Sequence, residues 1–153
     1  MKIAITTLAV LLATRTTPSA AQEKKVTPSQ LPAAVRRTAD EQSRGAKVLG
    51  YETEKENGQT VYEVEMTVGG RSRDVTIDSS GNVLEVEEQV VFDSLPEAVR
   101  SGLRAAAGGG QITNVESLTK RGTLVAYEAH VRTGDKRSEI QVGPDGKPLA
   151  HPE

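Results

Sequence analysis

The feature that most constrains the fold is an internal repeat. The segment SQLPAAVRR begins at Ser29, and the closely similar segment DSLPEAVRS begins at Asp93, 64 positions later. The likeness resumes after one inserted residue, because VYEVEM from Val61 resembles AYEAHV from Ala126. Self-similarity at a fixed period is typical of a structural unit that occurs twice in a chain. We therefore predict two tandem units of the same fold.

Each unit is predicted to open with an amphipathic helix. Ser29 and Asp93 are the expected N-caps, because a short side-chain oxygen can accept a hydrogen bond from the free N–H groups of the first turn. Apolar residues then recur at the spacing of one helix face. They are Leu31, Ala34, Val35 and Ala39 in the first unit and Leu95, Ala98, Val99 and Leu103 in the second.

A meander of antiparallel strands is predicted to follow each helix. Asn57-Gly58 is a strong hairpin signal, because both central residues of a type I′ turn need positive φ. In TVYEVEMTV, residues 60–68, apolar and charged side chains alternate. Such alternation is typical of a strand with one covered and one solvated face. In the second unit we expect a shortened last strand at residues 148–150.

The predicted fold class is therefore α+β. It consists of two tandem helix-plus-antiparallel-meander (α-β4) repeats, residues 22–91 and 92–153, which form one sheet with the helices on one face. The chain has no cysteine and no tryptophan, so no disulfide can stabilise it. Because small cores of Val, Leu, Ile and Ala are marginal, we expect the two units to share one core.

Residues 1–21 are predicted to be a signal peptide. Lys2 gives a positive start, residues 3–13 are apolar, and small residues precede an expected cleavage site between Ala21 and Gln22. The apolar run is shorter than the roughly 20 residues that span a bilayer, so a membrane anchor is the less favoured interpretation. We expect a periplasmic or secreted protein that is not embedded in a membrane.

Composition argues against nucleic acid as a partner. The chain has 19 basic and 21 acidic side chains, and residues 1–21 contain two of the basic ones and none of the acidic ones. The remainder is therefore acidic, whereas nucleic-acid binding needs clustered Lys and Arg.

No catalytic residue, cofactor or metal site is predicted. The serines lie outside any Gly-x-Ser-x-Gly elbow. His130 is a lone histidine at an outward strand position, and His151 lies in the C-terminal tail. Neither has the spacing of a metal-binding motif. We therefore predict that the protein is not an enzyme.

The outward sheet face is the candidate binding surface for a protein or peptide. A polar face of mixed charge can dock a partner, and an exposed edge strand can accept an extended peptide. The alternative is that these side chains only keep the sheet soluble. The acidic strand at residues 85–89 is likewise either a patch that binds cations or a basic partner, or simply the solvated side of a strand. The predicted face residues are Glu63, Glu65, Arg71, Arg73, Glu128, His130, Arg132 and Arg137.

The helix, strand and hairpin motifs together resemble the PepSY-type domain. The likeness rests on LPAAVR, VYEVEM and VTIDSSGNVL in the first unit, and on AYEAHV and IQVGPDGKPL in the second. The chain is similar in plan to tandem PepSY-like, β-lactamase-inhibitor-protein-like (BLIP-like) proteins of bacteria. It lacks the paired cysteines and the aromatic-rich face of the dedicated inhibitor, so tight binding of a β-lactamase is not expected.

The resemblance implies an exported, non-enzymatic binding module, because family members inhibit or chaperone peptidases or bind proteins at the cell envelope. Our functional prediction is that the sheet docks a protein or peptide, with an envelope peptidase as one possible partner. The alternative is a small-ligand or cation-responsive envelope stress protein. The oligomeric state stays open.

Overall fold

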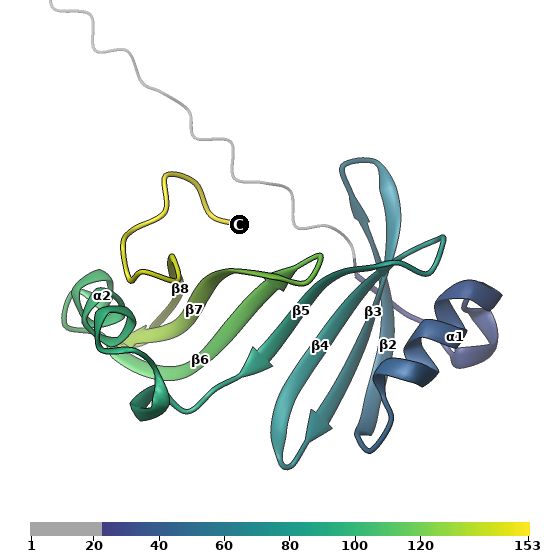
Figure 1. Cartoon of the computed structure of the whole chain (residues 1–153), viewed down its shortest axis with the longest axis horizontal. Helices are drawn as coiled ribbons and strands as arrows, with labels where there is room; N and C mark the ends of the chain where they lie inside the picture. The colour runs from purple at the N-terminus through teal and green to yellow at the C-terminus, as the bar shows by residue number, and fades with distance from the viewer. Residues whose placement is uncertain (1–22) are drawn as a thin grey trace, which may run out of the picture.

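The computed structural model describes residues 23–153 as one antiparallel sheet with two α-helices. Every strand pairs with the next strand in the chain, so the order in the sheet is β1 to β8 (Figure 1). The α+β class is therefore confirmed. The predicted signal peptide, residues 1–21, lies outside the described residues.

After the two-residue strand β1, the elements follow the chain in two rounds, each an α-helix and then strands. The helices are α1 (Ala33–Gln42) and α2 (Glu97–Ala107). The strands are β1 (Lys24–Lys25), β2 (Lys47–Glu56), β3 (Gln59–Val68), β4 (Arg71–Asp78), β5 (Val83–Gln89), β6 (Gln111–Lys120), β7 (Thr123–Thr133) and β8 (Lys136–Val142).

The helices begin later than the sequence predicts. Ser29 lies in a short 3₁₀ turn, and α1 begins after Pro32, which occupies the N-cap position. Asp93 and Pro96 repeat this arrangement before α2. The expected capping role of Ser29 and Asp93 was wrong because a residue before proline is excluded from the α region, which leaves Leu31 extended at φ −73° and ψ 139°.

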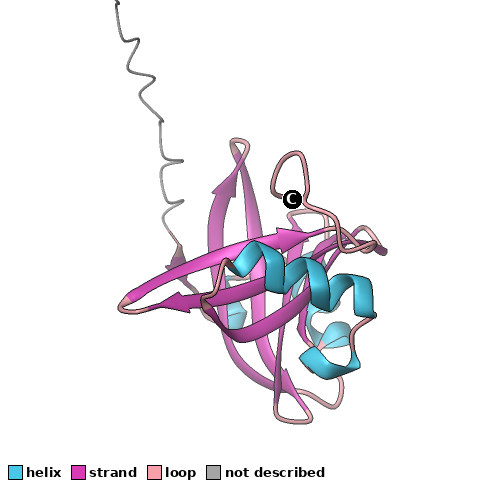
Figure 2. Ribbon diagram, turned by 90° about the vertical axis from the view of Figure 1, so that its left-hand side faces the viewer, coloured by secondary structure: helices cyan, strands magenta, loops and turns pink. Residues whose placement is uncertain are grey.

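The pairing of β5 with β6 joins the two rounds of elements into one sheet. Val86, which packs on the first core, lies opposite Thr119 of β6. Val115 of the second core is four residues from Thr119 and so projects from the same side. Both helices therefore cover one face of the sheet, at opposite ends of the molecule (Figures 1 and 2).

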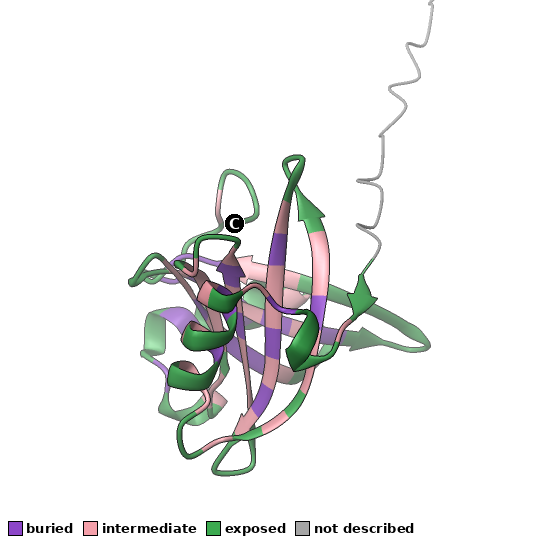
Figure 3. Ribbon diagram, turned by 90° about the vertical axis from the view of Figure 1, so that its right-hand side faces the viewer, coloured by how far each residue is buried: buried purple, intermediate pink, exposed green. Residues whose placement is uncertain are grey.

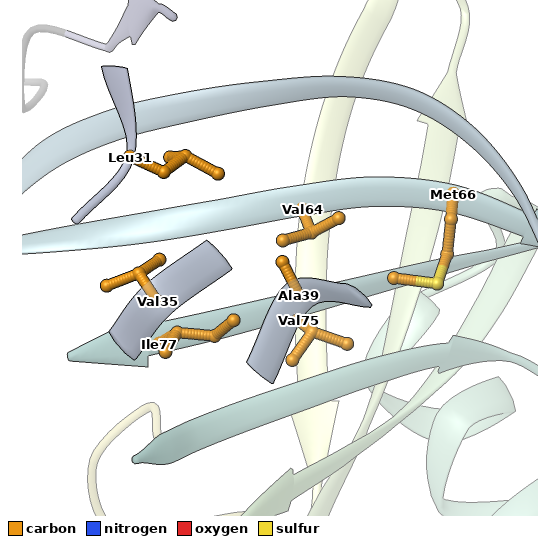
Figure 4. Packing of buried hydrophobic residues seen from close by; sticks show 7 residues of the cluster. All are labelled: Leu31, Val35, Ala39, Val64, Met66, Val75 and Ile77. Carbon is orange, nitrogen blue, oxygen red and sulfur yellow. The ribbon is translucent and has the colours of Figure 1, made fainter. Parts of the chain in front are cut away.

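The helix-covered face contains two separate cores and not the single shared core expected from the sequence. In the strands beneath α1, buried residues alternate with more exposed ones (Figure 3). Because α1 packs mainly on β4 and α2 mainly on β8, each helix covers only its own end of the sheet. The first core is Leu31, Val35, Ala39, Val64, Met66, Val75 and Ile77 (Figure 4). The second is Leu95, Val99, Leu103, Val115, Ala129 and Val142.

The second round of elements has three strands where four were expected. After β8 only an isolated bridge forms, between Val142 and Pro148. Proline lacks the N–H that a continuing ladder requires. The intervening turn instead packs against α2, where a Cβ on Gly102 would collide with the carbonyl group of Gly146. The matching turn of the first round is held by a hydrogen bond from Thr38 Oγ1 to the Gly81 carbonyl oxygen, at 2.7 Å.

No helix of residues 23–153 is long and apolar enough to cross a membrane.

The contact between Gly102 and the Gly146 turn predicts that Gly102→Ala destabilises the protein. Alanine favours a helix by up to about 1 kcal/mol over glycine, but here its methyl group must displace a backbone carbonyl. We expect a net loss of about 1–3 kcal/mol in the free energy of unfolding, measured by urea denaturation. Ser101→Ala, at the exposed neighbouring position, is the control and should change it by less than about 0.5 kcal/mol. Equal stability of the two variants would contradict the packing.

Candidate functional site: an acidic sheet face

The sheet face opposite the helices, called the open face below, is crowded with carboxylates. On β3, Glu63 and Glu65 alternate with buried Val64 and Met66. The registers of the neighbouring strands bring further acidic residues to the same side. The open-face carboxylates of β2 to β8 are Glu52, Glu54, Glu56, Glu63, Glu65, Asp74, Asp78, Glu85, Glu87, Glu116, Glu128 and Glu139.

Arg71 and Arg73 do not belong to this face, which corrects the prediction made from the sequence. The Arg73 guanidinium reaches α1, where it donates to the backbone oxygen of Gln42 at 3.2 Å and to Gln42 Oε1 at 3.1 Å. It also pairs with Glu88 on the helix side, at 3.1 Å. Arg71 is two residues earlier on the same strand and so projects to the same side. The open face is therefore more acidic than predicted.

The other predicted residues do share the open face. Glu63 and Glu65 lie on β3, and Glu128 and His130 on β7. Arg132 is paired directly with Arg137 of β8 at the far end of the face. Whether these side chains contact a partner stays a prediction.

Like charges lie directly opposite one another in neighbouring strands. Glu63 is paired with Glu52, and Asp74 is paired with Glu65 on one side and Glu87 on the other. Like charges in such positions destabilise a sheet. Because departures from local stability rules are expected at functional sites, this face is the candidate site.

Burial among these charges raises several carboxyl pKa values. Partial burial, together with the neighbouring Asp74 and Glu65, raises the pKa of Glu63 to about 7. Burial and the nearby Glu65 and Glu116 raise the pKa of Asp74 to about 6. For Glu87, burial together with Glu85 and Glu128 raises the pKa to about 8. Around neutral pH the open face therefore holds protons, which its carboxyl groups would release to solvent when a cation docks beside them.

Among residues 23–153, lysine side chains pair with the carboxylates of the open face at its borders. Lys25 lies 3.7 Å from Glu52 at the β1 edge. Lys120 lies between Glu85, at 3.5 Å, and Glu153 of the C-terminal tail, at 3.8 Å. The centre of the face, around Asp74 and Glu87, is lined by carboxylates from both rounds of strands.

One cluster on the open face combines a histidine with two carboxylates. His130 Nε2 lies 3.4 Å from Glu116 Oε2 and 3.9 Å from Glu128 Oε1. Sequence analysis placed Glu128 and His130 on one face but missed Glu116. The segment EAHVR contains a Glu-x-His pair that alternation alone puts on one side, whereas Glu116 joins them only through the register of β6 with β7, which pairs it with Glu128.

Comparison with known proteins identifies the first half of this architecture. Residues 25–87 match the family model described as "Peptidase propeptide and YPEB domain". This match to the PepSY family model covers less than half of the chain. The resemblance seen in the sequence is thus confirmed, and no curated protein matches the chain.

Solved structures with the same fold extend the likeness beyond residues 25–87. A BLIP-like protein from Bacteroides fragilis is 18% identical, with a TM-score of 0.58 over 78% of this chain and 83% of its own. A protein from Bacteroides eggerthii described as periplasmic is 15% identical, with a TM-score of 0.64 over 78% and 86% of the two chains. A DUF2874 family protein from Bacteroides ovatus is 16% identical, with a TM-score of 0.62 over 78% and 85%. At these identities the likeness establishes the fold.

The raised carboxyl pKa values predict that the protein is more stable in mild acid. A carboxyl group with a higher pKa in the folded than in the unfolded chain keeps its proton longer when folded. The free energy of unfolding therefore falls as the pH rises above 4.5, the ordinary pKa of a glutamate carboxyl group. The fall is complete above the pKa of Glu87, which is about 8. We expect a melting temperature a few degrees higher at about pH 5.5 than at about pH 8.5, measured by calorimetry.

Neutral variants locate this effect. Glu63→Gln and Glu87→Gln should each raise the melting temperature at about pH 8.5 and narrow the gap between the two pH values. Glu41→Gln removes the same charge from the exposed surface of α1 and should leave the gap unchanged. A gap that none of these variants alters would show that the open face is not its source.

Proposed function

We propose that this protein is an exported, non-enzymatic binding module whose open face docks a positively charged segment of a protein partner. The observation that carries the proposal is the run of carboxylates paired across β2, β3, β4 and β5 without enough cations beside them. A Lys- or Arg-rich surface supplies the missing charges, and such complementarity speeds encounter and sets register.

The energetics of the open face favour a partner over bare solvation. In the free protein, Glu63, Asp74 and Glu87 are held partly protonated by burial and by one another. A docked cation favours the ionised form of each and relieves the repulsion between them. Docking therefore converts a destabilising feature of the free protein into binding free energy. Side chains that only kept the sheet soluble would have no need to lie so close together.

A peptidase is the partner class that we favour. The support is the family description of residues 25–87, which names peptidase propeptides, and the shared fold with a BLIP-like protein. On this proposal the module inhibits or modulates an envelope peptidase by covering a basic surface near its substrate cleft. Export after cleavage near Ala21-Gln22 would place this module with an envelope peptidase in the periplasm, the compartment in the description of the Bacteroides eggerthii protein.

We also propose that residues 22–91 and 92–153 are two copies of one unit. Val35 and Val99, at the 64-residue offset, are both fully buried beneath their own helix. A 3₁₀ turn and a proline precede both helices in the same way. The second copy has lost its last strand and keeps an acidic open face, so duplication doubles the length of the docking surface.

Charge-neutral variants on the two faces of the molecule test the docking proposal. A peptidase captured from envelope extract is purified, and its affinity for the full chain is measured by calorimetry at several salt concentrations. Glu63→Gln with Glu65→Gln should weaken binding at least about 10-fold and reduce its salt dependence. Asp40→Asn with Glu41→Gln removes the same charge from exposed positions of α1 and should leave both unchanged.

Binding should also tighten as pH rises from about 6 to about 8, because docking a cation releases protons from the open-face carboxylates. The peptidase's activity, followed in the same titration, reports whether docking inhibits it. Equal loss of affinity in both double variants, or binding insensitive to salt and pH, would contradict docking on the open face.

A further inference from the structure

We propose that Glu116, Glu128 and His130 form a binding site for a divalent transition-metal ion, with Zn²⁺ as the best fit. One ligand atom from each residue lies within 4.8 Å of the others. The second functional hypothesis from the sequence, a cation response, relied on the acidic strand at residues 85–89. The geometry instead points to the neighbouring strands β6 and β7.

The separations match those of metal ligands. Zinc binds histidine nitrogen and carboxylate oxygen at about 2.0–2.2 Å, usually with tetrahedral geometry, so two of its ligand atoms lie about 3.4 Å apart. His130 Nε2 is 3.4 Å from Glu116 Oε2 and 3.9 Å from Glu128 Oε1. All three ligand atoms lie within 4.8 Å of one another, so side-chain movements on the order of an ångström would bring them to the separations of three tetrahedral ligands.

Donors outside the cluster hold the two carboxylates in a ligating orientation. Glu116 Oε1 accepts hydrogen bonds from Ser72 Oγ, at 3.1 Å, and from Asn114 Nδ2, at 2.9 Å. Glu128 Oε2 accepts one from Gln141 Nε2, at 2.7 Å. Each carboxylate therefore has one oxygen occupied and the other directed toward His130 Nε2. Such outer contacts are a regular part of metal sites, where they orient the ligands and tune their basicity.

An unsatisfied polar atom lies beside the cluster. Asn114 Oδ1 is buried without a hydrogen-bond partner among the described residues, while the nitrogen of the same amide contacts Glu116. A buried carbonyl oxygen without a donor is costly. A water molecule bound to the metal ion could donate the hydrogen bond that Asn114 Oδ1 lacks. Glu116 itself is only 9% exposed, and a buried carboxylate is normally paired with a cation or a metal ion.

The ligand set selects among metal ions. Imidazole nitrogen suits Zn²⁺ and its transition-metal neighbours, whereas Ca²⁺ and Mg²⁺ prefer oxygen ligands alone. Two carboxylates and a neutral imidazole balance a charge of +2. Three protein ligands leave one position for water or a partner's side chain, and the side chain of His130 is 42% exposed. The surrounding carboxylates attract cations toward this opening.

The histidine count of the chain provides a matched control, because His130 and His151 are its two histidines. The full chain, free of any purification tag and stripped with EDTA, is titrated with ZnCl₂ by calorimetry. We expect one saturable site, a higher melting temperature with Zn²⁺, and visible absorption bands when Co²⁺ replaces it. CaCl₂ and MgCl₂ at the same concentrations should give no comparable heat.

The variants decide whether this cluster is the site. His130→Gln should abolish the saturable heat, while Gln141→Ala, which removes an outer donor, should weaken binding by about 10- to 100-fold. His151→Gln should bind like the unaltered chain. Circular dichroism and melting without metal establish that each variant is folded. The proposal is overturned if the unaltered chain gives no saturable Zn²⁺ heat, if His130→Gln still binds, if His151→Gln also loses binding, or if Ca²⁺ competes equally.

Discussion

The pairing of β5 with β6 is the interaction on which the rest of the structure depends. The two cores are separate, so the two ends of the molecule are joined mainly by this ladder, which runs from Glu85 opposite Lys120 to Gln89 opposite Glu116. The hydrogen bond between Ser72 and Glu116 adds one side-chain contact across the junction. Because side chains alternate with a period of two, a slip of one residue would turn the open face of one half toward the helices.

The same ladder creates the electrostatics of the open face. It brings Glu87 near Glu128 and Asp74 near Glu116, so charges from both halves act on one another. Neither half alone would have so dense a carboxylate surface. The repulsion between these carboxylates lowers the stability of the folded chain, and burial of the two small apolar cores must offset it. Docking of a cationic partner and binding of a metal ion at its β6–β7 end are two ways in which the same excess of negative charge can be relieved.

At each end of the molecule a helix packs against a turn between or after the strands, and the two contacts differ. Beneath α1, a threonine hydroxyl on the helix bonds the carbonyl of the turn at Gly81. Beneath α2, Gly102 removes the side chain altogether and lets the turn at Gly146 approach the helix backbone. The second arrangement brings the turn after β8 close to α2, and among the described residues only the bridge between Val142 and Pro148 follows β8.

Local features were predictable from the amino acids alone. The spacing of Val35 and Ala39 predicts the buried face of α1, and the alternation along β3 predicts that Glu63 and Glu65 project to the side opposite Val64 and Met66. Asn57-Gly58 predicts a turn with positive φ, found at 47° and 81°. These succeed because helix and strand periodicity are properties of neighbouring residues. The error over the helix starts was also local, since a residue before proline resists the α region.

The tertiary structure decided what depends on partners distant in the chain. Alternation states which side of its strand Glu116 occupies but not that Glu128 and Ser72 lie beside it, since strand register supplies that information. Arg71 and Arg73 were misplaced even though alternation with Val75 and Ile77 puts them on the helix side; what only the structure adds is that Gln42 of α1 binds Arg73 there. The division into two cores likewise follows from where the helices lie on the sheet. Sequence thus reveals the face of each strand, while the pairing of strands and the packing of helices determine which charges meet.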